Sequence, residues 1–316
     1  MKIIDKKIQL HLIVTIGIMI GGFLGCGGPK QNLRSVTEYG NLTNPQKNQA
    51  PASYDSAIEI ETPKMTSEEL EMSGDLLLTK GNLSMAFSQY EKSLRLNSEN
   101  ARVHYKKGLT LILGGIGADA VKVFQEALRI DPEYALAYEG LGQTFFQMKE
   151  YGEAERNFLK AIELDSKLWK AHNYLGIIYN YRKRYDMAIN EYSSAIIIKP
   201  GKGLLYNNLG MSYILAGDYE KAINAFNKAL DTKYSRNKVY NNLGLALSKA
   251  GRHKQALKAF KKGGKGPQAY NNLGCVYLEQ GKIEEAADCF ERAIRISPSF
   301  YIKANENLKK AKNKLQ

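Results

Sequence analysis

Apolar and small residues return along this chain at a fixed spacing. A block of tyrosine, two asparagines, leucine and glycine begins at Tyr206, again at Tyr240 and again at Tyr270, so that its copies lie 34 and 30 residues apart. A period in this range is typical of proteins built from stacked repeats, in which each unit buries its apolar face against the next. We therefore expect the chain to consist of a series of repeats rather than of separate compact domains.

The spacing inside one unit shows which positions must pack closely. Counting from Ala101, glycine stands at position 8 (Gly108), alanine at positions 20 and 27 (Ala120 and Ala127), and a large apolar residue at position 24 (Phe124). This pattern resembles the tetratricopeptide repeat, a helix–turn–helix of 34 residues. The resemblance implies two antiparallel helices that cross closest at positions 8 and 20, where small residues let the backbones approach.

The same pattern extends in both directions and predicts seven units followed by a capping helix over residues 301–316. We expect an all-α fold, a right-handed superhelix of helix–turn–helix units. The sixth unit is four residues short, which indicates either a tolerated deletion that bends the solenoid or a hinge or anion-contacting loop. The predicted units are 67–100, 101–134, 135–168, 169–202, 203–236, 237–266 and 267–300.

Glycine recurs at position 15, directly after the first helix of most units. A left-handed residue at a helix C-terminus is easiest for glycine, because it carries no side chain. Lys149 and Lys183 occupy this position in two units, and we expect the backbone there to be strained or to turn differently.

The first 25 residues have the layout of a secretory signal peptide, with a basic start, an apolar run from Leu12 to Ile20 and small residues at the exit. The tetrapeptide that ends at Cys26 resembles a bacterial lipobox, in which the cysteine is diacylated before the signal is removed. Cys26 is therefore the predicted lipidation site, with a retained inner-membrane signal anchor or a soluble secreted form as alternatives. Residues 26–66 are rich in polar residues and predict a disordered N-terminal tether.

Charge and cysteine content narrow the choice of partners. The formal net charge of +13 favours acidic partners or anionic surfaces. The leader would carry the chain away from nucleic acid, so we expect no nucleic-acid partner. Cys275 and Cys289 are predicted on facing helices of the last unit, either as a disulfide or as two free, small apolar residues.

We find no motif of a hydrolase, a metal site or a phosphate-binding loop in the sequence. His104 and His172 occupy position 4 of their units, where a packed ring is expected rather than a metal ligand. The sequence therefore predicts a protein that is not an enzyme and that uses no cofactor and no metal.

The resemblance implies that positions 2, 5, 6, 9, 12 and 13 face a concave groove. Asn208, Asn242 and Asn272 at position 6 resemble the asparagine ladder of O-linked N-acetylglucosamine transferases, where a carboxamide can clasp a peptide backbone. Recent duplication of the repeats would also explain them, and both interpretations stay open. Upstream the groove is predicted to be aromatic and basic. The predicted peptide-binding residues are Asn207, Asn208, Asn241, Asn242, Asn271, Asn272, Tyr105, Lys106, Phe146, Lys170, Tyr174 and Tyr181.

These features together predict a non-enzymatic scaffold that binds extended or helical segments of other envelope proteins. A lipid anchor would hold it in the cell envelope, with the outer membrane facing the periplasm as the expected site. The architecture is similar to that of repeat lipoproteins of pilus biogenesis, which suggests pilus or secretin assembly. The alternatives are an adaptor for envelope proteases, peptidoglycan hydrolases or polysaccharide export, and the regulatory array of an enzyme complex.

Overall fold

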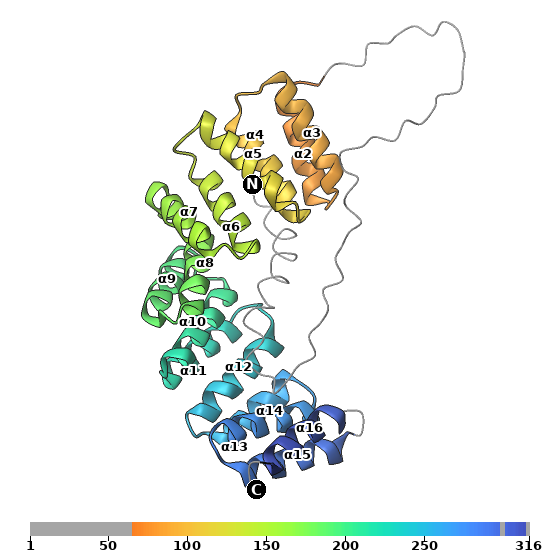
Figure 1. Cartoon of the computed structure of the whole chain (residues 1–316), viewed down its shortest axis with the longest axis vertical. Helices are drawn as coiled ribbons and strands as arrows, with labels where there is room; N and C mark the ends of the chain where they lie inside the picture. The colour runs from red at the N-terminus through yellow and green to blue at the C-terminus, as the bar shows by residue number, and fades with distance from the viewer. Residues whose placement is uncertain (1–64, 298–300, 314–316) are drawn as a thin grey trace, which may run out of the picture. The chain divides into compact units, whose positions relative to one another are not determined.

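A computed structural model describes residues 65–297 and 301–313 of the chain (Figure 1). The predicted signal peptide, the lipidation site Cys26 and the predicted tether up to residue 64 lie outside these described residues. Within them, no helix combines the length and the apolar character that a membrane span requires.

The described residues form helices and no strands, in agreement with the predicted all-α fold. The helices follow one another in pairs joined by short turns. Their bounds are α2 Ser67–Thr79, α3 Leu83–Leu96, α4 Ala101–Leu113, α5 Gly117–Ile130, α6 Ala135–Gln147, α7 Tyr151–Leu164, α8 Trp169–Tyr181, α9 Tyr185–Ile198, α10 Gly203–Ala216, α11 Tyr219–Leu230, α12 Arg236–Lys249, α13 His253–Gly263, α14 Gly266–Glu279, α15 Ile283–Ile296 and α16 Tyr301–Lys312.

Two compact units meet in sequence at Leu164, and each is described by itself. The first unit contains α2 to α7. Its first helix begins after Thr66, whose hydroxyl accepts a hydrogen bond from the Glu69 backbone at 3.2 Å, while the Glu69 carboxylate accepts one from the Thr66 backbone at 2.8 Å. This reciprocal cap satisfies two of the backbone donors that a helix start leaves unpaired.

Aromatic rings packed against glycines form the core of the first unit. Phe124 on α5 is fully buried, and a Cβ atom added to Gly108 on α4 would lie 2.6 Å from its ring. Gly140 on α6 lies equally close to the same ring, at 2.5 Å. Glycine at position 8 (Gly108) and at position 6 of the next unit (Gly140) is therefore required by the packing, because a side chain at either position would displace the Phe124 ring.

The second unit contains α8 to α16. In four successive pairs the first helix packs against the second, and the first helices α8, α10, α12, α14 and α16 also lie against one another in that order. We call these five helices the first-helix layer of the second unit. α16 closes the unit by burying Ala304, Leu308 and Ala311, with α15 as its main neighbour.

The turns after the first helices adopt the left-handed conformation that the sequence predicts. Five glycines stand there with φ between 74° and 88°, for example Gly217. Lys149 and Lys183 also adopt positive φ, at 66° and 60°. The prediction of strained backbone at these two lysines is confirmed, because a side chain in this conformation approaches its own carbonyl oxygen.

Two further predictions concern single side chains. His172 is buried, with Nδ1 2.7 Å from a carboxylate oxygen of Glu191 and Nε2 3.3 Å from the Ser166 carbonyl oxygen, and His104 Nε2 lies 3.0 Å from the Ser98 carbonyl oxygen. Cys275 and Cys289 are buried and do not form a disulfide with each other. Burial raises the pKa of the Cys289 thiol to about 12.

Candidate functional site

Paired asparagines join successive first helices of the second unit. The Asn208 side-chain amide on α10 donates to Asn173 Oδ1 on α8 at 3.0 Å, and the Asn242 amide on α12 donates to Asn207 Oδ1 on α10 at 2.8 Å. In both bonds position 6 of one helix donates to position 5 of the preceding helix. A longer contact of 3.4 Å from Asn207 Nδ2 to Asn208 Oδ1 links the two bonds into one carboxamide ladder.

The ladder residues are withdrawn from solvent. Asn207 is 1% exposed, Asn208 2% and Asn242 8%, and Asn271 on α14 is 1% exposed. The expectation that these four carboxamides face a peptide is therefore corrected. The first helices lie so close together that positions 5 and 6 meet one another, and a buried carboxamide must satisfy its donors and acceptor there. Asn173 completes the ladder, and sequence reasoning missed it because its unit lacks the second asparagine.

The ladder is interrupted between α12 and α14, at the short sixth pair. Asn241 on α12 donates instead to the carbonyl oxygen of Gly263 on α13, at 3.2 Å. Asn272 on α14, the position-6 residue that would reach it, is half-buried and makes no hydrogen bond with any other described residue. Beyond the interruption the pattern resumes, because the Asn307 amide on α16 donates to Asn271 Oδ1 at 2.8 Å.

A lysine without a counter-ion lies on the same face of α12 as the ladder. Lys238 precedes Asn242 by one helical turn and is half-buried. Burial lowers the pKa of its ammonium group, and no carboxylate among the described residues offsets this effect. Lys170 on α8 is half-buried too, Tyr174 is buried and Tyr181 is 67% exposed. Lys238 and Asn272 are thus two half-buried polar groups of the first-helix layer that keep unused bonding capacity.

In the first unit the predicted basic groove residue is neutralised. Lys106 Nζ on α4 donates to Glu71 at 2.5 Å and to Asp75 at 2.6 Å, both on α2, and Arg102 donates to Glu71 at 2.8 Å. Burial acts to raise the pKa of the Glu71 carboxyl, but the hydrogen bonds and charges of Arg102 and Lys106 outweigh it, so the pKa lies below its ordinary value. Lys106 is therefore a structural ion-pair partner and is not free to bind an acidic peptide, which corrects the expectation.

The predicted aromatic groove residues of the first unit belong to its core. The Tyr105 ring centroid lies 6.0 Å from that of Phe124 and 5.7 Å from that of Tyr134, and burial raises the pKa of the Tyr105 hydroxyl well above its ordinary range. Phe146 is 6% exposed and its ring centroid lies 5.5 Å from that of Tyr151. Both rings pack between helices, so the expectation that they contact a ligand is corrected.

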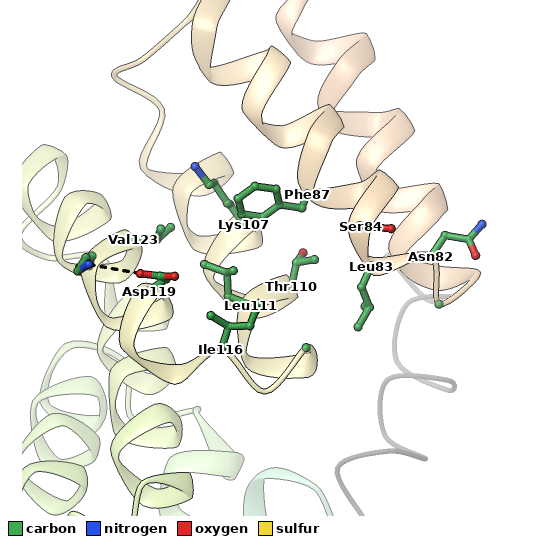
Figure 2. A pocket seen from close by; sticks show the side chains of 13 residues that line it. Asn82, Leu83, Ser84, Phe87, Lys107, Thr110, Leu111, Ile116, Asp119 and Val123 are labelled. Carbon is green, nitrogen blue, oxygen red and sulfur yellow. Dashed lines mark hydrogen bonds and ion pairs between the residues drawn. The ribbon is translucent and has the colours of Figure 1, made fainter. Parts of the chain in front are cut away.

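A cavity of about 500 Å³ opens in the first unit between α3, α4 and α5 (Figure 2). The Lys107 ammonium at its rim lies 4.8 Å from the Phe87 ring centroid and pairs with Glu91 at 2.6 Å. A largely apolar lining of this size suits an apolar side chain. Sequence reasoning missed it, because no single repeat position marks a cavity formed by three helices. Its apolar lining residues are Leu83, Phe87, Leu111, Ile116 and Val123, with Lys107, Asp119 and Lys122 as charged neighbours.

The described part of the chain contains no group of side chains that is suited to bind a metal ion. None of its histidines, cysteines, aspartates and glutamates gather in a group of three or more that could hold a metal ion. The arrangement offers hydrogen-bonding groups, charges and an apolar cavity, which are the means by which a protein surface binds another molecule.

Family models agree with the repeat pattern. Models described as tetratricopeptide repeat match residues 135–168, 168–235, 207–270 and 267–300, and one described as TPR repeat matches residues 118–149. Together they run without a gap from 118 to 300, which is more than half of the chain. No curated protein sequence matches it.

Solved structures share the fold at low sequence identity. A tetratricopeptide repeat protein from Parabacteroides merdae is 18% identical, with 78% of this chain and 98% of that chain covered and a TM-score of 0.53. PilF of Pseudomonas aeruginosa is 20% identical, with 68% and 97% covered and a TM-score of 0.51.

The Cut9–Hcn1 hetero-tetramer of the APC/C is 22% identical, with 78% of this chain covered and a TM-score of 0.54. The match spans 48% of that longer chain. At these identities the comparisons establish the fold, and they confirm the predicted tetratricopeptide architecture.

Proposed function

Because the chain belongs to the tetratricopeptide repeat family, we propose that it is a lipid-anchored scaffold of a bacterial cell envelope that binds segments of partner proteins along its first helices. Proteins of this fold act as non-catalytic scaffolds for protein–protein interaction, and none of the matching families is a family of enzymes. The lipid anchor rests on the lipobox resemblance at Cys26.

One observation carries the binding site in this proposal. The carboxamide ladder satisfies the paired asparagines of α8 to α12, but the short sixth pair leaves Asn272 with both a donor and an acceptor unused. A carboxamide can bond the N–H and C=O groups of an extended peptide without reading its side chains. Lys238, on the neighbouring helix α12, supplies a positive charge for an acidic residue of the same peptide.

Assembly of pili or of an outer-membrane secretin is the envelope process that we propose for this scaffold. The fold is shared with PilF of Pseudomonas aeruginosa, and the predicted export and lipidation would bring the chain to the envelope.

Site-specific crosslinking tests the proposed binding site. A photo-crosslinking residue at position 268 on α14, which is exposed and lies one turn before Asn272, is expected to capture a discrete set of envelope proteins in living cells, identified by mass spectrometry. The same residue at position 224, an exposed asparagine on the second helix α11, is the matched control and should capture few or none. Equal capture from both positions, or none from position 268, would exclude this site.

Substitution measures how much the free carboxamide contributes. Losing a hydrogen bond worth about 1 kcal/mol predicts about fivefold weaker capture for Asn272→Ala, with the crosslinker kept at position 268 on α14. Asn224→Ala should leave capture unchanged. If both variants captured the partner as well as the unaltered protein does, Asn272 would not be the contact.

A further inference from the structure

The positive charge of this protein is concentrated in one stretch of the chain. From Thr232 to Leu278 the sequence contains ten lysine and arginine residues and no aspartate or glutamate, while the whole chain carries a net charge of +13. This stretch covers α12, α13 and most of α14. The short sixth pair is thus also the most basic part of the protein.

The exposed face of α13 holds four of these ten charges. Lys254, Lys258, Lys261 and Lys262 are exposed, Lys265 follows directly after the helix, and none of the five forms an ion pair with another described residue. Two neighbouring carboxylates already form ion pairs with other basic residues. Arg252 lies 3.2 Å from Glu220, and Lys249 lies 3.0 Å from Glu279. We call these five lysines the lysine face.

Aromatic rings from the two flanking helices hold part of the lysine face in place. α13 packs against α12 and α14 (Figure 1). The Lys261 ammonium lies 5.2 Å from the ring centroid of Tyr270 on α14, and the Lys262 ammonium lies 5.3 Å from that of Tyr240 on α12. A cation over an aromatic face keeps its full positive charge while its position becomes restricted.

The lysine face lacks the features of a protein–protein interface. Ala256, Ala259 and Phe260 point into the core, and no large exposed hydrophobic side chain occurs between Ile197 and Ile296, a range that the structure describes throughout. Interfaces between proteins need apolar or aromatic anchors at their centre. Its charges are also all lysines, which act as mobile point charges and do not read a carboxylate in two-point geometry as arginine does.

From this geometry we propose that the lysine face of α13 binds the surface of a bilayer that contains anionic phospholipids. A cluster of four to eight basic residues without apolar anchors suits a diffuse layer of headgroup charge. The contact is separate from the acyl anchor proposed at Cys26 and from the peptide site near Asn272, since it lies on the second helix of its pair.

Vesicle flotation tests the proposal independently of the anchor. The full chain carries Cys26→Ser, which removes the acylation site, and is mixed with vesicles of phosphatidylcholine alone or of phosphatidylcholine with phosphatidylglycerol. Binding to the anionic vesicles is expected to exceed binding to the neutral ones by about tenfold or more at low salt, and to fall as salt is added. The leader is itself basic and also favours anionic vesicles, so its contribution is removed by comparing two variants that share it.

A charge-matched pair of variants locates the contact. Lys254→Gln, Lys258→Gln, Lys261→Gln and Lys262→Gln together should lower the preference for anionic vesicles by about tenfold. The control removes four exposed lysines from other second helices, Lys92→Gln, Lys122→Gln, Lys221→Gln and Lys228→Gln, and should retain the preference. Circular dichroism checks that both variants keep their helix content.

Three outcomes would overturn the proposal. Equal binding to both vesicle types would show that charge does not govern the contact. An equal loss in the two variants would show that only net charge matters. Tighter binding of the lysine face to duplex DNA or RNA than to anionic vesicles at the same salt concentration would assign the surface to nucleic acid.

Discussion

At the scale of single residues, the asparagine at repeat position 6 has two different roles in this protein. Asn208 and Asn242 use their amides to join neighbouring helices, while Asn272 occupies the same repeat position and keeps its amide free. The repeat pattern predicted where these asparagines lie but not what they bond. Their hydrogen-bond partners lie on other helices, about 35 residues away in sequence, so the local spacing of residues does not predict them.

Replacing Asn208 with alanine should destabilise the second unit by about 2–6 kcal/mol. The substitution leaves Asn173 Oδ1 and Asn207 Nδ2 unpaired in a buried site, and each unpaired group costs about 1–3 kcal/mol. Urea unfolding followed by circular dichroism measures the change. Asn272→Ala is the control and should stay within about 0.5 kcal/mol of the unaltered protein, because it breaks no bond with a described residue. A similar stability for the two variants would contradict the ladder.

At the scale of helices and turns, the sequence predicted the structure best at positions where packing allows only one residue type. Gly108 at position 8 faces the Phe124 ring at a distance that excludes any side chain, and the glycines at position 15 have positive φ. These requirements arise within one helix pair, so they repeat with the period of the sequence. Lys149 and Lys183 are exceptions that the same rule identified as strained.

Replacing Lys149 or Lys183 with glycine should stabilise the protein by about 0.5–1 kcal/mol. A lysine with positive φ loses about 1–2 kcal/mol to backbone crowding, and the greater freedom of glycine in the unfolded chain offsets part of that gain. Thermal unfolding at fixed scan rate measures the effect. Lys80→Gly makes the same chemical change at a helix end with φ −78°, where no crowding is relieved, and should not stabilise. A gain at Lys80 as large as at Lys149 would refute the explanation.

At the scale of the whole molecule, the net positive charge predicts acidic partners or anionic surfaces. The distribution of this charge along the chain locates the expected contact in one stretch of the sequence. Ten basic residues fall in a stretch without acidic residues, and the structure shows which five of them remain unpaired on one exposed face. The predicted lipid anchor belongs to the same scale, since export and acylation decide which surfaces the lysine face can meet.

Metabolic labelling with a palmitate analogue tests the anchor. The unaltered chain should incorporate the label and remain with the membrane fraction, and Cys26→Ala should incorporate none, because this cysteine is the predicted acylation site. Cys289→Ala serves as the control for removal of a cysteine and should be labelled normally. Label on the Cys26→Ala protein would exclude lipidation at this residue.

The sequence by itself determined the helix pairs, the small residues at their crossings and the left-handed turns, because these depend on contacts within one repeat and return with its period. Only the tertiary structure decided which asparagine side chains bond to other helices and which one remains available to another molecule. That choice depends on how close one first helix lies to the next, and the four-residue shortening of the sixth pair changes this locally. Asn241 then bonds Gly263, and Asn272 keeps its carboxamide free of the other described residues.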